Sequence, residues 1–294
     1  MTLQLVVTRP AREAAAWLPV LTQAGFDPLA LPLLSFGPPS DSGRLNAARM
    51  GLAGFDAVMF VSPQAVHAFL GKDFEINSAS ALSYVDFIAI NDDLRRSPLR
   101  CWAPGPGTAQ ALERVGVPWA RIDQPTPDAA QFDSEALWSV VGPQVVPGWR
   151  VLVVRGELDV PADVSQNGQG AGREWLADQC RAAGAVVHMC VAYKRQKPDW
   201  SPAMRAAARS AATNGAVWLF SSSEGVANLA QLLPDQHWGQ AQALTTHPRI
   251  AHAVKGLGFG RIEVCRPAQA DVLQTLNNWR NSSVSQRATP VPAP

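Results

Sequence analysis

Seven hydroxyl and guanidinium side chains lie at turns that lead out of short apolar runs, and together they could bind several anions. Where such a turn opens a helix, free backbone N–H groups and a partial positive charge favour carboxylates and phosphates. These candidate substrate-binding residues are Arg9, Ser62, Thr108, Arg155, Ser221, Ser222 and Arg249. Any one hydroxyl could equally be a helix cap. The hypothesis of an anion site therefore depends on the number of such turns and on the three arginines among them.

Tyr193 is a separate candidate, because it is one of only two tyrosines and directly precedes the basic run Lys194 to Lys197. A phenol in this position can donate a hydrogen bond or a proton to a reacting group. It can also simply pack where two domains meet. The residues alone leave both interpretations open.

Several other kinds of chemistry lack their motifs. The run Gly105-Pro106-Gly107 has no third glycine at the dinucleotide spacing, and no GK[ST] follows, so we expect neither a nicotinamide nor an ATP cofactor. The five histidines show no HxH or HExxH spacing, and no G-x-S-x-G elbow occurs. The four cysteines are scattered without a CxxC pair, which argues against a metal site and a disulfide framework. We expect no cofactor and no metal.

The composition is that of a globular protein with room for two cores. The chain has 294 residues, of which 47% are hydrophobic and 17% charged, with a net charge of +1. This balance gives no basic face for nucleic acid. No signal peptide and no apolar stretch of the roughly 20 residues that a membrane span needs is visible, so we expect a cytoplasmic protein without nucleic-acid or membrane partners.

The turns that carry the candidate residues occur in pairs, as a degenerate internal repeat. Each pair joins a turn in the first half of the chain to one in the second half, in a shifted order. The pairs are 58–66 with 217–226, 105–116 with 248–258, and 6–10 with 153–156. Two similar units that face each other would make a cleft, and clefts bind ligands.

Short apolar strands alternate with helices of about ten residues, a pattern typical of α/β domains with parallel sheets covered on both faces. Proline-containing exits at 36–39 and 197–198 indicate two crossings between domains. We therefore predict a discontinuous domain 1 (1–35 plus 198–280), an inserted domain 2 (38–193) and a disordered tail (281–294). We also predict a strand over 87–90, and a glycine-rich surface loop over 157–172 that decorates the fold rather than covering the cleft.

The chain resembles the uroporphyrinogen-III synthase family in the order and spacing of its motifs, over nearly everything up to Trp279. No single motif is diagnostic. The matching segments are Thr8-Arg9-Pro10, Leu31-Pro32-Leu33-Leu34, Phe55-Asp56, 60–66, Gly105 with Thr108-Ala109, Arg155-Gly156, Gly172-Arg173-Glu174 with Leu176, 191–195, 220–226, 247–251 and Leu257-Gly258.

The resemblance implies two flavodoxin-like or Rossmann-like domains joined by a two-strand ladder. It also implies a lyase that needs no cofactor and closes hydroxymethylbilane, a linear tetrapyrrole with eight carboxylates, with inversion of the last ring and loss of water. Tyr193 matches the family's functionally important tyrosine and would assist departure of the ring-A hydroxyl. Ser62, Thr108 and Ser221 would hold acetate and propionate groups. The resemblance favours a monomer and leaves open a transient contact with hydroxymethylbilane synthase.

This chain departs from the family at the turn over 247–251, where hydroxyl residues are replaced by His247-Pro248-Arg249 and Arg249 is the plausible substitute. Two other classes of protein compete with the enzyme. One is a non-catalytic two-lobed protein that binds or senses small anions. The missing secretion signal argues against an extracellular protein of this kind, but not against an intracellular one. The other is a glycosyl- or nucleotide-transferase, which should show phosphate-loop motifs that are absent here.

Overall fold

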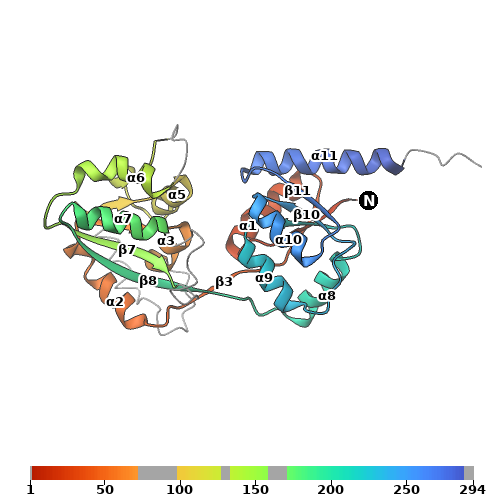
Figure 1. Cartoon of the computed structure of the whole chain (residues 1–294), viewed down its shortest axis with the longest axis horizontal. Helices are drawn as coiled ribbons and strands as arrows, with labels where there is room; N and C mark the ends of the chain where they lie inside the picture. Colours follow the sequence, from red (N-terminus) through yellow and green to blue (C-terminus); the bar gives the residue numbers. More distant parts are fainter. Residues whose placement is uncertain (1, 72–97, 127–132, 158–170, 288–294) are drawn as a thin grey trace, which may run out of the picture. The chain divides into compact units, whose positions relative to one another are not determined.

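The computed structural model describes residues 2–71, 98–126, 133–157 and 171–287, and the chain divides into two compact units (Figure 1). Unit 1 comprises Met1–Ser35 and Gln196–Pro294, and unit 2 comprises Phe36–Arg195. The chain thus passes between the units twice, in β3 (Ser35–Gly37) and near the end of β8 (Val186–Gln196), which are neighbouring strands of one sheet.

Unit 1 is built on a five-stranded sheet in the order β11-β10-β9-β1-β2, with every neighbouring pair parallel. Counted along this unit alone, the order is 2-1-3-4-5, which is the flavodoxin-like arrangement. Its elements are β1 (Gln4–Val7), α1 (Ala11–Gln23), β2 (Asp27–Ala30), α8 (Pro202–Ala211), β9 (Val217–Phe220), α9 (Ser223–Leu232), β10 (Gln242–Thr245), α10 (Pro248–Leu257), β11 (Arg261–Val264) and α11 (Gln269–Arg287).

Unit 2 has a six-stranded sheet in the order β3-β8-β7-β4-β5-β6, in which the pairs from β8 to β6 are parallel. Its further elements are α2 (Ser42–Met50), β4 (Ala57–Phe60), α3 (Pro63–Leu70), β5 (Arg100–Trp102), α5 (Pro106–Arg114), β6 (Ile122–Asp123), α6 (Ser134–Val141), β7 (Arg150–Gly156) and α7 (Ala171–Ala182). Short 3₁₀ turns cover Leu52–Gly54, Trp119–Arg121 and Gly142–Gln144.

The two units are circular permutations of one arrangement. The β1-α1-β2 segment comes first in unit 1, and its counterpart β7-α7-β8 comes last in unit 2. The remaining strands correspond in order, β9, β10 and β11 to β4, β5 and β6. This confirms the predicted α/β pseudo-repeat and explains why the sequence pairs appear in a shifted order.

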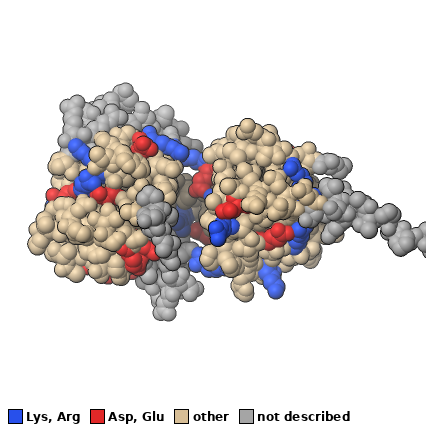
Figure 2. Space-filling model, turned by 90° about the horizontal axis from the view of Figure 1, so that it is seen from above, with Lys and Arg blue, Asp and Glu red and all other residues tan. Residues whose placement is uncertain are grey.

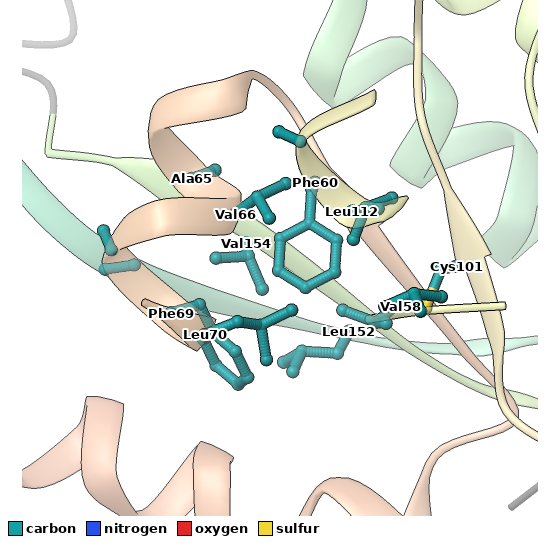
Figure 3. Packing of buried hydrophobic residues seen from close by; sticks show 14 of the residues in the cluster. Val58, Phe60, Ala65, Val66, Phe69, Leu70, Cys101, Leu112, Leu152 and Val154 are labelled. Carbon is teal, nitrogen blue, oxygen red and sulfur yellow. The ribbon is translucent and has the colours of Figure 1, made fainter. Parts of the chain in front are cut away.

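Alternate residues of the buried strands pack on opposite faces of each sheet, as the two-residue period of a strand requires. In unit 2, Val58 and Phe60 pack against α3 and α5, whereas Ala57 and Met59 pack against α6 and α7. Figure 3 shows Phe60 surrounded by apolar side chains of α3, α5 and neighbouring strands. In unit 1, α8, α9 and α10 cover one face, and α1 with α11 covers the other. These cores hold the helix N-termini at the carboxyl edges of the strands.

Three features differ from the sequence-based expectations or lie outside the described residues. Helices α2 and α8 were not predicted. Helix α11 continues to Arg287, past the expected start of the tail at 281, because no glycine or proline interrupts the chain before Pro290. The strand expected over 87–90, most of the loop expected over 157–172 and the last residues of the tail, 288–294, lie outside the described residues.

On the face shown in Figure 2, acidic and basic side chains are interspersed among uncharged ones on each unit. Among the described helices, none has both the length and the apolar character that crossing a membrane requires.

All four cysteines are free, and three of them are buried.

Candidate functional site

Strand order reverses at one point in each sheet, between β1 and β9 in unit 1 and between β7 and β4 in unit 2. In open parallel sheets this reversal leaves a crevice outside the carboxyl ends of the two strands, and ligands bind there. Arg9 and Ser221 follow β1 and β9, whereas Arg155 and Ser62 lie at the ends of β7 and β4. The candidate residues of each unit therefore gather at the edge where this fold binds ligands.

In unit 2, Ser62 and Tyr193 form a hydroxyl pair. Ser62 Oγ lies 3.2 Å from Tyr193 Oη. Ser62 is also the N-cap of α3, where its Oγ accepts a hydrogen bond of 3.2 Å from the backbone N–H of Ala65. Tyr193 is only 1% exposed, whereas Ser62 is half-buried. The serine hydroxyl is thus the more accessible end of the pair.

The other two unit 2 candidates lie near the same edge in different surroundings. Thr108 is in the first turn of α5 and is 4% exposed. The N-termini of α5 and α3 are neighbours, since a Cβ added at Gly107 would lie 3.7 Å from Pro63 Cγ. Arg155 is half-buried near the end of β7, and its Nε is enclosed without a hydrogen-bond partner among the described residues. An enclosed donor of this kind suits an anionic ligand.

In unit 1, Arg9 lines a narrow pocket at the carboxyl ends of β1, β9 and β10, together with Ser221 and Thr246. The enclosed part of this pocket has room for about one water molecule. The guanidinium of Arg9 lies 4.6 Å from the ring centroid of Trp17 and donates from Nη1 to Glu13 Oε2 at 3.0 Å. Arg9 is therefore already paired with a carboxylate in the first turn of α1, the helix that follows it.

The serines of the run after β9 have different roles. Ser222 is the N-cap of α9 and accepts from the Gly225 N–H at 3.3 Å, whereas Ser221 lines the pocket. Capping uses one acceptor position of Ser222 Oγ, and Ser221 is the serine of this run that lines the pocket. Ser223, the third serine of the run, has a buried Oγ without a partner among the described residues.

Arg249 lies in the first turn of α10, and its side chain is exposed. The residue at the cap position of that turn is His247, whose Nδ1 accepts from the Arg249 backbone N–H at 3.0 Å. The histidine thus takes over the capping role of the missing hydroxyl. The sequence signal for it was Pro248 at the first helical position, which indicates a cap just before it.

The structure also brings Glu13 and Gly156 to the site. The sequence did not mark either as a candidate site residue, although Gly156 belongs to the matching segment Arg155-Gly156. Glu13 pairs with Arg9, and its spacing of four residues is visible in the sequence. Gly156 lies against the Tyr193 ring, which only strand pairing could reveal. Within the described ranges, no group of three or more His, Cys, Asp or Glu side chains could hold a metal ion.

Three comparisons with known proteins agree. The family model described as Uroporphyrinogen-III synthase HemD matches residues 15–274. A uroporphyrinogen-III synthase from Synechococcus elongatus is 28% identical over 230 residues, which cover 78% of this chain and 74% of that protein. The crystal structure of uroporphyrinogen-III synthetase from Helicobacter pylori 26695 is 13% identical, with a TM-score of 0.53, over 95% of this chain and 100% of that one. At this identity, the last comparison supports the fold alone.

Proposed function

The chain belongs to the uroporphyrinogen-III synthase family, and from this membership we propose how its residues carry out the reaction. The protein is a cyclising hydro-lyase that closes hydroxymethylbilane with inversion of the terminal ring and loss of water. The observation that carries this function is the family match over residues 15–274, which spans both units. The alternative of a non-catalytic anion-binding or sensor protein is not favoured.

The first chemical step is loss of the ring-A hydroxyl. Its C–O bond breaks, the oxygen takes the bonding electrons and a proton and leaves as water, and an azafulvene cation remains. The terminal ring then attacks through its substituted carbon to give a spiro intermediate, which fragments and closes again in the inverted sense. Loss of one proton from the terminal ring neutralises the cation and balances the proton that left with the water. Because hydroxymethylbilane also cyclises spontaneously without inversion, the enzyme acts largely by orienting a reactive chain.

We assign the assistance at the leaving hydroxyl to the pair Tyr193 and Ser62. A serine oxygen has two acceptor positions and one proton to donate. With the Ala65 N–H on one acceptor position and the Tyr193 O–H on the other, the Ser62 proton is left for the substrate. Accepting the phenol's hydrogen bond strengthens Ser62 as a donor. This arrangement accounts for a buried tyrosine that acts at a substrate.

Substrate carboxylates would bind at the carboxyl edges of both units. In unit 2 the proposed contacts are Thr108, Arg155 and the helix N-termini beside Ser62, and in unit 1 they are Arg9, Ser221, Ser222 and Arg249. For Ser222 the contact comes from the helix N-terminus that it caps. We further propose that no cofactor takes part, that the enzyme is a monomer, and that it meets hydroxymethylbilane synthase only transiently.

The activity is tested by mixing the protein with freshly generated hydroxymethylbilane, oxidising the products to porphyrins and resolving isomer I from isomer III. We expect isomer III in excess over a control without protein. If the product is isomer I alone at every protein concentration, the synthase function is wrong.

Binding of the substrate should weaken with salt, because a polyanion meets arginines and helix N-termini at partly exposed edges. We expect KM to rise several-fold between about 0.05 M and 0.5 M NaCl while kcat changes little. Thermal unfolding over the same range serves as the control for stability. A KM that stays flat would contradict the assignment of charged groups to substrate binding.

Glu13→Gln should lower KM, because the variant removes the carboxylate that occupies Arg9. An exposed ion pair is worth at most about 1 kcal/mol, so we expect KM to fall by about 2- to 5-fold. Asp178→Asn breaks a similar exposed pair with Arg181 on α7 and serves as the matched control, with KM unchanged. An unchanged or higher KM in Glu13→Gln would remove Arg9 from the substrate contacts.

A further inference from the structure

The strand pairing beside Tyr193 contains a β-bulge. Along β7 and β8, Val154 pairs with Cys190 and Arg155 with Val191, but Gly156 pairs with Tyr193, which leaves Ala192 as an extra residue. Successive residues of a regular strand point to opposite faces, and a bulge shifts this alternation by one. Tyr193 consequently joins Cys190 in the core cluster covered by α3 and α5. This is the face on which α3 carries Ser62.

At this register the Tyr193 ring occupies the space that a side chain at Gly156 would need. A Cβ added to Gly156 would lie 2.6 Å from Cε2, 2.7 Å from Cζ and 3.0 Å from Oη of Tyr193. Contacts below 3.0 Å essentially never occur at real Cβ atoms. Gly156 is not among the glycines with positive φ, so its backbone conformation is open to other residues. The position requires a glycine for space and not for its backbone angle.

The ring has little freedom to move away. The edge-to-face contact with Phe36 has a centroid distance of 5.4 Å and an interplanar angle of 89°. The Tyr193 carbonyl accepts a hydrogen bond of 2.6 Å from the Glu157 N–H, which holds the backbone on the other side of the bulge. A side chain at position 156 would therefore displace the ring at the expense of the 3.2 Å contact between Oη and Ser62 Oγ.

We propose that Gly156 is a positioning residue for catalysis: its missing side chain is the space that lets the Tyr193 phenol reach Ser62. This inference rests on the proposed role of Tyr193 in the synthase reaction. It adds a requirement at a residue that has no side chain to act on the substrate.

Gly156→Ala tests the proposal through the rate of isomer III formation. Misplacing a catalytic group by about 1 Å can cost about 100-fold, so we expect kcat to fall by roughly 10- to 100-fold with KM within about 2-fold. In a Tyr193→Phe background, where no phenol is left to misplace, Gly156→Ala should lower kcat no further. The matched control is Gly256→Ala, where an added Cβ meets nothing within 4 Å. Full activity in Gly156→Ala, or equal losses in both backgrounds, would overturn the proposal.

If Gly156→Ala folds poorly, thermal unfolding tests whether the added side chain clashes with the Tyr193 ring. Overpacking of this kind should lower the midpoint of thermal unfolding by roughly 3–10 °C in the natural background. In a Tyr193→Ala background, where the ring is absent, the same substitution should change the midpoint by less than about 2 °C. An equal loss in both backgrounds would show that the clash is not with Tyr193. Failure of the catalytic role is seen separately, as unchanged activity in Tyr193→Phe.

Discussion

Tyr193→Phe should lower kcat for isomer III formation by about 100-fold, near the lower end of what a positioned proton donor contributes. The variant loses only the hydroxyl, so the ring keeps its contacts with Phe36 and Gly156. Ser62 then loses the donor on one of its two acceptor positions and becomes a weaker donor to the leaving hydroxyl. Uncaptured substrate cyclises spontaneously, so isomer I should replace isomer III in the product. Initial rates and the isomer ratio at several substrate concentrations separate kcat from KM.

Ser62→Ala tests the other hydroxyl of the pair. If the two hydroxyls act as one relay, Ser62→Ala should lose about as much activity as Tyr193→Phe. The double variant should lose no more than either single variant, because the two effects are not additive. Ser139→Ala is the matched control in unit 2, because that exposed hydroxyl donates to the Ala136 carbonyl of its own helix. Unchanged turnover in Tyr193→Phe would mean that the phenol serves only packing.

Of the substitutions proposed here, Arg49→Met should destabilise the protein most, with a loss of about 2–4 kcal/mol in the free energy of unfolding. Arg49 is 2% exposed and donates from Nε to the Phe69 carbonyl at 3.1 Å and from Nη2 to the Ala68 carbonyl at 2.6 Å. Burial lowers its pKa to about 10, so the guanidinium stays charged at neutral pH. Methionine fills similar apolar space but leaves these carbonyls, at the C-terminal end of α3, without that donor.

Denaturant titration followed by circular dichroism measures this loss. The control is Arg44→Met on the same helix α2, where the side chain is 89% exposed and forms a surface ion pair with Asp41, so we expect a change within about 0.5 kcal/mol. Arg49→Lys should recover only part of the stability, since an ammonium group lacks the fork of the guanidinium. Equal stability of Arg49→Met and Arg44→Met would contradict this account of the α3 C-terminus.

Much of the fold could be predicted because its signals are local. A run of buried apolar residues followed by Ser62-Pro63 defines a strand, a cap and a helix start within ten residues, and β4 and α3 follow that pattern. Helix α2 was missed because it buries only Leu45 and Arg49, which give no apolar stripe. Helix α8 was missed because much of its buried face is alanine, although Ser201-Pro202 carries the same cap signal as Ser62-Pro63.

The candidate site was predictable in its residue types and only partly in its contacts. Three consecutive serines after β9 cannot reveal which one caps α9, because the cap depends on where the helix starts. In the same way, the partners of Arg9 depend on which face the following helix α1 turns toward it. Family motifs identify candidate residues, whereas hydrogen bonds follow from backbone positions.

The α/β class, the shifted repeat and the family follow from the amino-acid sequence alone, since these depend on periodicity, spacing and the order of motifs along the chain. The side of the unit 2 sheet that carries Tyr193 follows only from how the folded strands pair. A strand's alternation predicts the opposite side from Cys190, and a single extra residue, Ala192, in a pairing with β7 reverses it. Strand register is a property of two segments more than thirty residues apart, so it becomes fixed only when both strands lie in the same sheet.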